Sequence, residues 1–154
     1  MKQEDKDLLF KELCTRLPYG VKISVESWDG KEQGFVDKVD VLYSVNKDEY
    51  IESTNEDYDF SIEDVKPYLF PLSSITKEQS IELFNLFGID LVASISTDYI
   101  KINECTGITF FLNKGFDVET HLDKLIDWLN KNHFDYCGLI PKGLAIDATG
   151  KNIY

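Results

Sequence analysis

The sequence of 154 residues predicts an α+β protein with an N-terminal helix, an SH3-like antiparallel β-meander or barrel, and a C-terminal helix–hairpin–helix part. Apolar residues recur at helical spacing within residues 10–17 and again within residues 118–129. Within residues 21–25 they instead alternate with polar residues, as in a strand with one buried face. A chain of this length buries about 70% of the surface that it exposes when unfolded, so a core of its own is expected.

The first predicted element is a helix that ends at Pro18 and Gly20. Acidic residues near its start suit the positive end of the helix dipole. The residues expected on its buried face, at i, i+3, i+4 and i+7, are Phe10, Leu13, Cys14 and Leu17.

A block of strands is expected next. Val21, Ile23 and Val25 should face a core, and the pair Asp29-Gly30 indicates a hairpin. A short third strand is expected around residues 50–51. In the second strand we expect the buried face at the odd-numbered positions, which are Phe35, Val39, Val41, Tyr43 and Val45.

The β part is expected to close through a helical turn. Ile62 and Val65 lie three residues apart, and Pro67 and Pro71 then exclude a regular helix but permit an extended edge segment. Small SH3-like barrels often close by a helical turn and a short strand after a meander of strands, which is an analogy at the level of the fold. We therefore predict the N-terminal helix and an SH3-like β subdomain over residues 1–73.

The remaining residues, 74–154, are predicted to form an α/β subdomain. Thr76 and Gln79 form a capping box that opens a helix ending near Gly88. An alternating segment at residues 89–95 precedes a hairpin made of residues 99–103 and 108–112.

Asp117 should cap a second helix in this part, and the tail should fold against the protein. The apolar stripe of that helix runs through residues 118–129. The tail, residues 134–154, is rich in Gly and Pro but also in apolar residues, so we expect an irregular packed segment with a short strand near residues 144–146.

Targeting signals and cysteines both indicate the cytoplasm. The N-terminus lacks the apolar region of a signal peptide, and no apolar stretch approaches the roughly 18 residues of a membrane span. The three cysteines, Cys14, Cys105 and Cys137, are an odd number and form no C-x-x-C motif. We expect three buried thiols in a reducing compartment.

No metal, cofactor or catalytic motif is evident, so we expect a protein that is not an enzyme and holds no cofactor. His121 and His133 are separated by about 18 Å of helix, too far to share an ion. The acidic loop that includes Asp59 lacks the Gly and Glu positions of a calcium loop. Cys137 follows His133 by four residues and is the one local nucleophile–base pairing, but the sequence leaves open whether the two meet.

The net charge of −12 is concentrated in residues 48–64, which contain eight acidic residues and no Lys or Arg. An acidic surface does not suit direct binding to nucleic-acid phosphates. One interpretation is a solvated loop that keeps the protein soluble. The other is a docking surface for a basic protein, with tyrosines as anchors. An inhibitor that mimics nucleic acid is a special case of the second.

Eight residues are candidates for contact with a partner. Trp128 lies off the apolar stripe of its helix, so it either packs under the tail or is exposed as a binding hot spot. The candidate partner-binding residues are Asp48, Glu49, Glu52, Glu56, Asp57, Tyr58, Asp59 and Trp128.

Three blocks of the sequence resemble a group of small proteins, without an assigned function, that is common in phage, prophage and other mobile regions of gut Bacteroidales genomes. The blocks are residues 13–21 (LCTRLPYGV), residues 65–74 (VKPYLFPLSS), and residues 127–130 with 133–136 (DWLN and HFDY). Where this group usually has a basic residue after the last Tyr, the chain has Cys137. The resemblance implies a cytoplasmic accessory protein of phage or mobile-element type and brings no activity with it.

These observations favour a non-enzymatic protein-interaction or accessory module, with no membrane or direct nucleic-acid partner. The alternative is an acidic inhibitor or nucleic-acid mimic that binds a basic host defence or regulatory protein. The sequence does not determine the oligomeric state.

Overall fold

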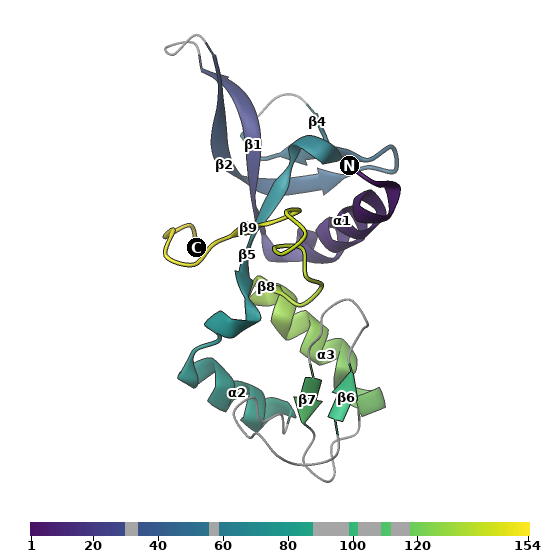
Figure 1. Cartoon of the computed structure of the whole chain (residues 1–154), viewed down its shortest axis with the longest axis vertical. Helices are drawn as coiled ribbons and strands as arrows, with labels where there is room; N and C mark the ends of the chain where they lie inside the picture. Colours follow the sequence, from purple (N-terminus) through teal and green to yellow (C-terminus); the bar gives the residue numbers. More distant parts are fainter. Residues whose placement is uncertain (30–33, 56–58, 88–98, 102–108, 112–117) are drawn as a thin grey trace. The chain divides into compact units, whose positions relative to one another are not determined.

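A computed structural model describes residues 1–29, 34–55, 59–87, 99–101, 109–111 and 118–154. The fold is α+β, as predicted, and divides into two compact units (Figure 1). Unit 1 comprises Met1–Phe70 and Leu139–Tyr154, and unit 2 comprises Pro71–Gly138. The sequence-based division fell after residue 73 and placed the whole tail in the second part, whereas the last sixteen residues (139–154) belong to unit 1.

Helix α1, Gln3–Arg16, opens unit 1 and ends through a 3₁₀ turn, Leu17–Tyr19. Gly20 follows with φ of +62°, a left-handed conformation that glycine adopts without steric cost. The buried side of α1 is formed by Leu9, Glu12, Leu13 and Arg16.

The predicted face of α1 is confirmed for Leu13 and, as partly buried residues packed against the core, for Phe10 and Leu17, but it is wrong for Cys14. The buried set has the expected i, i+3, i+4, i+7 spacing, but it starts at Leu9, so Cys14 is exposed. Two of its members are charged: Arg16 Nη2 lies 3.1 Å from the carboxylate of Glu12. Two of the four buried positions carry an ion pair. A search for apolar residues at helical spacing therefore does not find this face. Of the three thiols predicted to be buried, Cys137 is buried and Cys14 is not, while Cys105 lies outside the described residues.

The first four strands of unit 1 form an antiparallel meander. β1, Lys22–Asp29, pairs with β2, Gly34–Val45, from Lys22 opposite Val41 to Asp29 opposite Gly34, which confirms the predicted hairpin. β3, Tyr50–Ser53, pairs with the end of β2, and β4, Phe60–Ser61, pairs with β3.

A 3₁₀ turn, Ile62–Asp64, leads into β5, Lys66–Pro71, as the spacing of Ile62 and Val65 predicted. β5 runs antiparallel to β1, with Pro67 opposite Ile23. On its other side it pairs in parallel with β9, Ile146–Asp147, which confirms the short strand predicted for the tail. The prediction of an edge segment at β5 is therefore wrong, because the tail supplies a neighbouring strand. The result is an open, mostly antiparallel sheet.

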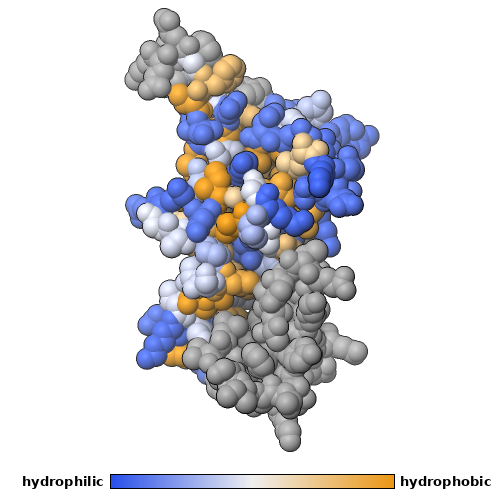
Figure 2. All heavy atoms as spheres, in the orientation of Figure 1, coloured by the Kyte–Doolittle hydropathy of each residue, from blue (hydrophilic) through white to orange (hydrophobic). Residues whose placement is uncertain are grey.

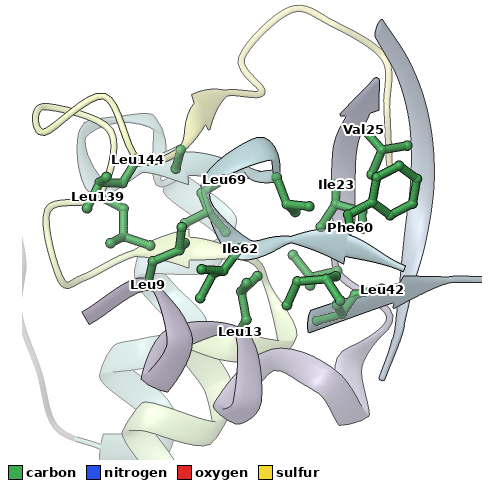
Figure 3. Packing of buried hydrophobic residues seen from close by; sticks show 14 residues of the cluster. Leu9, Leu13, Ile23, Val25, Leu42, Phe60, Ile62, Leu69, Leu139 and Leu144 are labelled. Carbon is green, nitrogen blue, oxygen red and sulfur yellow. The ribbon is translucent and has the colours of Figure 1, made fainter. Parts of the chain in front are cut away.

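The core of unit 1 lies between α1, the sheet and the C-terminal segment. Figure 3 shows Leu9 and Leu13 of α1 pointing toward side chains of the strands, with Leu139 and Leu144 of the tail closing one side. Val21, Ile23 and Val25 are buried, as predicted. The buried members of the cluster are Leu9, Leu13, Val21, Ile23, Val25, Leu42, Ile51, Phe60, Ile62, Val65, Leu69, Leu139, Leu144 and Ala145.

The predicted buried face of β2 is wrong for Phe35, Val39 and Tyr43, whereas Val45 is partly buried and packs against the core, as predicted. Phe35 and Tyr43 are 68% and 64% exposed, whereas Asp40 and Leu42 are buried. The reason is the pairing register, because residues directly opposite each other on neighbouring strands share a face. Ile23 on the core face of β1 lies opposite Asp40, so Asp40 and Leu42 turn inward. Beyond the register shift between Leu42 and Ser44, Val45 lies opposite the buried Ile51.

The described part of unit 2 contains two helices and short strands. It begins with a 3₁₀ turn, Leu72–Ser74, before α2, Lys77–Phe87. The predicted capping box is confirmed: Gln79 N–H donates to Thr76 Oγ1 at 3.2 Å, and Thr76 N–H donates to Gln79 Oε1 at 2.9 Å. β6, Tyr99–Lys101, and β7, Thr109–Phe111, pair antiparallel.

Helix α3, Val118–Lys131, is followed by β8, Phe134–Asp135. Leu125 and Leu129 of its predicted apolar stripe are buried. The segment 89–95 and the helix boundaries predicted at Gly88 and Asp117 lie outside the described residues. In the part of the chain that the structure describes, no helix has the length and apolarity needed to cross a membrane.

Candidate functional site

The acidic residues 48–64 begin in the turn between β2 and β3, which the side chain of Asn46 organises. Asn46 Oδ1 accepts hydrogen bonds from the backbone N–H groups of Asp48 at 2.9 Å and Tyr50 at 3.1 Å. Glu49 adopts a left-handed φ of +64° there. Asp48 is exposed as a result, at the tip of the turn.

The structure brings a lysine to these acids that the linear sequence did not place among them. Lys6 Nζ of α1 lies 2.9 Å from Glu49 and 3.7 Å from Glu63, and the N-terminal amino group lies 3.9 Å from Glu63. The hydrogen bond to Glu49 raises the pKa of Lys6. Glu49 therefore takes part in an ion pair within unit 1, and part of the local negative charge is compensated.

The remaining described candidates in this segment reach solvent. Asp59 is exposed, and Glu52 is half-buried on β3. Glu52 and Tyr50 lie two residues apart in one strand and therefore share a face. That face is the outer one, because the intervening Ile51 is buried. Tyr50 is 49% exposed, so an aromatic ring and a carboxylate lie together at the surface.

Three candidate residues, Glu56, Asp57 and Tyr58, lie outside the described residues. The residues on either side are described. Asn55 precedes them and donates its backbone N–H to Asp40 of β2, and Asp59 precedes β4.

The anchor of this loop is Asp40, a residue that sequence reasoning missed. Its side chain accepts hydrogen bonds from Thr54 Oγ1 at 2.7 Å, Asn55 N–H at 3.0 Å and Val41 N–H at 2.7 Å. Burial alone would raise the pKa of Asp40, but the hydrogen bonds from Thr54, Ser53 and the two backbone N–H groups lower it to about 2.

The sequence signal for this anchor is weak. An Asp between Val39 and Val41 looks like a solvent-facing position in an alternating strand. The polar run of Ser53, Thr54 and Asn55 is the one hint that a buried carboxylate finds donors nearby.

Trp128 is buried in unit 2, with an exposed fraction of 6%. Its ring stacks on Phe134 at a centroid distance of 5.7 Å and an interplanar angle of 12°. Of the two placements that the sequence left open, the structure shows the packed one.

Figure 2 shows one face of the molecule, on which the hydrophilic residues of unit 1 gather toward the side of the N-terminus and the β2–β3 turn.

Metal ligands and the Cys137–His133 pair are the chemical groups to be located among the described residues. Among them, no group of three or more His, Cys, Asp or Glu side chains is arranged to hold a metal ion. Cys137 is buried, and His133 is half-buried with a left-handed φ of +57° just after α3.

Comparison with known proteins adds no relative. No family model matches the chain, and neither a curated protein nor a solved structure matches it.

Proposed function

We propose that this chain is a non-enzymatic protein-interaction module whose unit 1 docks a partner with a basic surface. Unit 1 is taken as an SH3-like fold, and the order α2, β6–β7 hairpin, α3 in unit 2 as a helix–hairpin–helix part. Support for the SH3-like assignment comes from a four-strand meander followed by a 3₁₀ turn and a final strand that returns beside β1. Such small β folds serve many roles, so the function rests on the surface and not on the fold.

The observation that carries this proposal is the pairing of exposed aromatic rings with carboxylates at the end of β2 and the start of β3. Tyr43 is 64% exposed and Tyr50 is 49% exposed, and Asp48 lies in the β2–β3 turn and Glu52 on β3 beside them. Tyrosine provides a large apolar ring with a polar tip, which suits it to interfaces. Carboxylates around it steer and orient a positively charged partner.

The biological setting that we propose is that of a cytoplasmic accessory protein of phage or mobile-element type. The resemblance of residues 13–21, 65–74 and 127–136 to the Bacteroidales group supports this setting. The position of the gene beside genes of phage replication, packaging or defence evasion would test it, and a location among housekeeping genes would contradict it.

The test of the docking function is a charge-matched comparison. The variant Asp48→Asn/Glu52→Gln/Asp59→Asn removes three negative charges from the candidate surface. The control Glu78→Gln/Glu82→Gln/Asp123→Asn removes three charges from exposed positions of unit 2. Proteins captured from host lysate are identified by mass spectrometry, and their affinity for each purified chain is then measured by calorimetry.

We expect a basic protein that binds the original chain and the control alike and loses about tenfold or more in affinity for the triple variant. Equal binding to all three chains would overturn the proposal. The salt dependence of the binding affinity distinguishes an acidic nucleic-acid mimic from a docking module. Binding by charge alone falls steeply with salt, whereas binding that includes tyrosine contacts retains a salt-insensitive part.

A further inference from the structure

Lys6 of α1 bridges two carboxylates that belong to different elements of unit 1. Its Nζ lies 2.9 Å from Glu49 in the β2–β3 turn and 3.7 Å from Glu63 in the 3₁₀ turn before β5. In Figure 1 the start of α1 lies beside the β2–β3 turn. The two carboxylates therefore already hold a side-chain cation, which is the group that a basic partner would present to them.

The backbone keeps these two carboxylates close together without help from Lys6. Ile62 N–H donates to the carbonyl oxygen of Glu49 at 3.2 Å, which ties the β2–β3 turn to the residue before Glu63. Glu63 N–H in turn donates to Ser61 Oγ at 3.4 Å. If Lys6 moved away, the two negative charges would remain near each other and repel, and this arrangement favours the binding of another cation.

The ion pairs of Lys6 are open to competition from solvent. The side chains of Lys6, Glu49 and Glu63 are 24%, 30% and 44% exposed. Ion pairs at such exposure contribute little to stability, so Lys6 can leave its partners at a small cost. The guanidinium group of an arginine can replace it with two parallel hydrogen bonds to one carboxylate, a geometry that an ammonium group does not offer.

We infer that Lys6 is an intramolecular competitor, which occupies Glu49 and Glu63 in the free protein and is displaced by an arginine-rich segment of a docking partner. This inference rests on the proposed function and adds a form of regulation to the same surface, because Glu49 adjoins the exposed Asp48 and Tyr50. The contact raises the number of positive charges that a partner must bring, since one of them has to replace Lys6.

The probe is a fluorescent, N-terminally blocked hexaarginine peptide, titrated with the full chain at low ionic strength and followed by fluorescence anisotropy. Its control is the same peptide with citrulline in place of arginine, which keeps the shape of the side chains and removes their charge. We expect the arginine peptide to bind at least about tenfold more tightly than the citrulline peptide. Equal affinity for the two peptides would overturn the inference.

The decisive variant is Lys6→Gln, and its matched control is Lys11→Gln at an exposed position of the same helix. Both substitutions remove one positive charge from α1, so they change the net charge alike. Lys6→Gln should bind the arginine peptide about threefold or more tightly than Lys11→Gln does. Lys6→Arg keeps the charge and should bind the peptide no more tightly than the original chain.

A double-mutant cycle connects the gain in affinity to the two carboxylates. In a Glu49→Gln/Glu63→Gln background, Lys6→Gln and Lys11→Gln should bind the peptide equally, within about 1.5-fold. A gain that persists in this background would mean that Lys6 acts elsewhere, and the inference would fail.

A labelling experiment on the original chain replaces any variant that circular dichroism shows to be unfolded. The lysines are acetylated with an amine-reactive reagent, and the products are read by mass spectrometry of peptides. Addition of the arginine peptide should raise the labelling rate of Lys6 about threefold relative to that of Lys11, because the displaced ammonium group reaches the reagent. An unchanged ratio of the two rates overturns the inference.

The outcomes separate this inference from the proposed function. If the triple variant of the acidic docking surface binds the peptide more weakly while Lys6→Gln and Lys11→Gln bind alike, the docking surface stands and the inference fails. If the triple variant binds as the original chain does and Lys6→Gln still gains affinity, the inference stands for Glu49 and Glu63 and the proposed surface fails. If Lys6→Gln lowers the stability to urea without changing the affinity, Lys6 only holds α1 to the turn, and the inference fails.

Discussion

The carboxylate of Asp40 on β2 accepts a 2.7 Å hydrogen bond from the hydroxyl of Thr54 at the end of β3. This contact holds the start of the acidic loop against the strand that precedes it by fourteen residues. It also accounts for a charged side chain on the core face of β2, since a buried carboxylate is tolerated only when donors surround it.

Replacing Asp40 with Ala should lower the free energy of unfolding by about 1–3 kcal/mol, because the donors of Thr54 and Asn55 lose their acceptor. The measurement is urea unfolding followed by circular dichroism. Asp37→Ala, on the exposed face of the same strand, is the control and should change stability by less than about 0.5 kcal/mol. Equal effects of the two substitutions would contradict the anchoring role of Asp40.

The stability that Asp40 provides should depend on pH. Its folded pKa of about 2 lies below the usual value for Asp of about 3.9, so its contribution is complete above pH 4–5 and is lost as the pH falls toward 2. The loss amounts to about 2–3 kcal/mol. Urea unfolding of the original chain and of Asp40→Asn at several pH values should show a difference that shrinks between pH 5 and 2. A difference that stays constant over this range would refute the prediction.

The hydroxyl of Tyr154 connects β1 and β5. It donates to the carbonyl oxygen of Tyr68 at 2.8 Å and accepts from Lys22 N–H at 2.9 Å, and its ring lies 5.7 Å from that of Phe70. Tyr154→Phe keeps the ring contact but removes both hydrogen bonds, so it should cost about 1–2 kcal/mol in thermal or urea unfolding. Tyr43→Phe, at an exposed ring, is the matched control and should be neutral within about 0.5 kcal/mol.

Burial raises the pKa of the Tyr154 phenol to about 12, against a usual value of about 10. A raised folded pKa means that the stabilisation is complete below pH 10 and is lost as the pH rises toward 12. Tyr154→Phe should therefore lose stability less steeply than the original chain between pH 10 and 12. Identical slopes would show that this phenol does not ionise with unfolding.

The two described cysteines should differ in reactivity. Cys14 is exposed on α1 and Cys137 is buried. In a Cys105→Ser background, a thiol reagent should label Cys14 in the native protein and reach Cys137 only after denaturant is added, as read by mass spectrometry of peptides. Partial burial raises the pKa of the Cys14 thiol, so its labelling should be slower than that of a free thiol. Rapid native labelling of Cys137 would contradict the packing of the tail.

Local signals predicted several elements correctly because neighbours in sequence decide them. The Thr76–Gln79 capping box satisfies the free N–H groups of a helix start within four residues. The pairing of β1 with β2 down to Asp29 and Gly34, and the 3₁₀ turn at Ile62 before β5, depend likewise on residues close in sequence.

The acidic turn contains an ion pair that local sequence signals did not predict. The sequence identified Asp48, Glu49, Glu52 and Asp59 as a concentration of charge, but it did not show that Lys6 of α1 compensates Glu49. That ion pair joins residues 43 positions apart, and no periodicity reports it. Trp128 required the tertiary structure as well, because its stacking on Phe134 was one of two placements that the helix stripe permitted.

The sequence by itself determined the α+β class, the N-terminal helix and the alternation of β1, since these follow from propensity, capping and period. Tertiary structure decided which side of α1 and of β2 is buried. An alternating strand with apolar residues on both sides has two nearly equivalent placements, and a one-residue shift exchanges them. The register against β1 and the hydrogen bonds to Asp40 select the placement that sends Phe35, Val39 and Tyr43 to the surface.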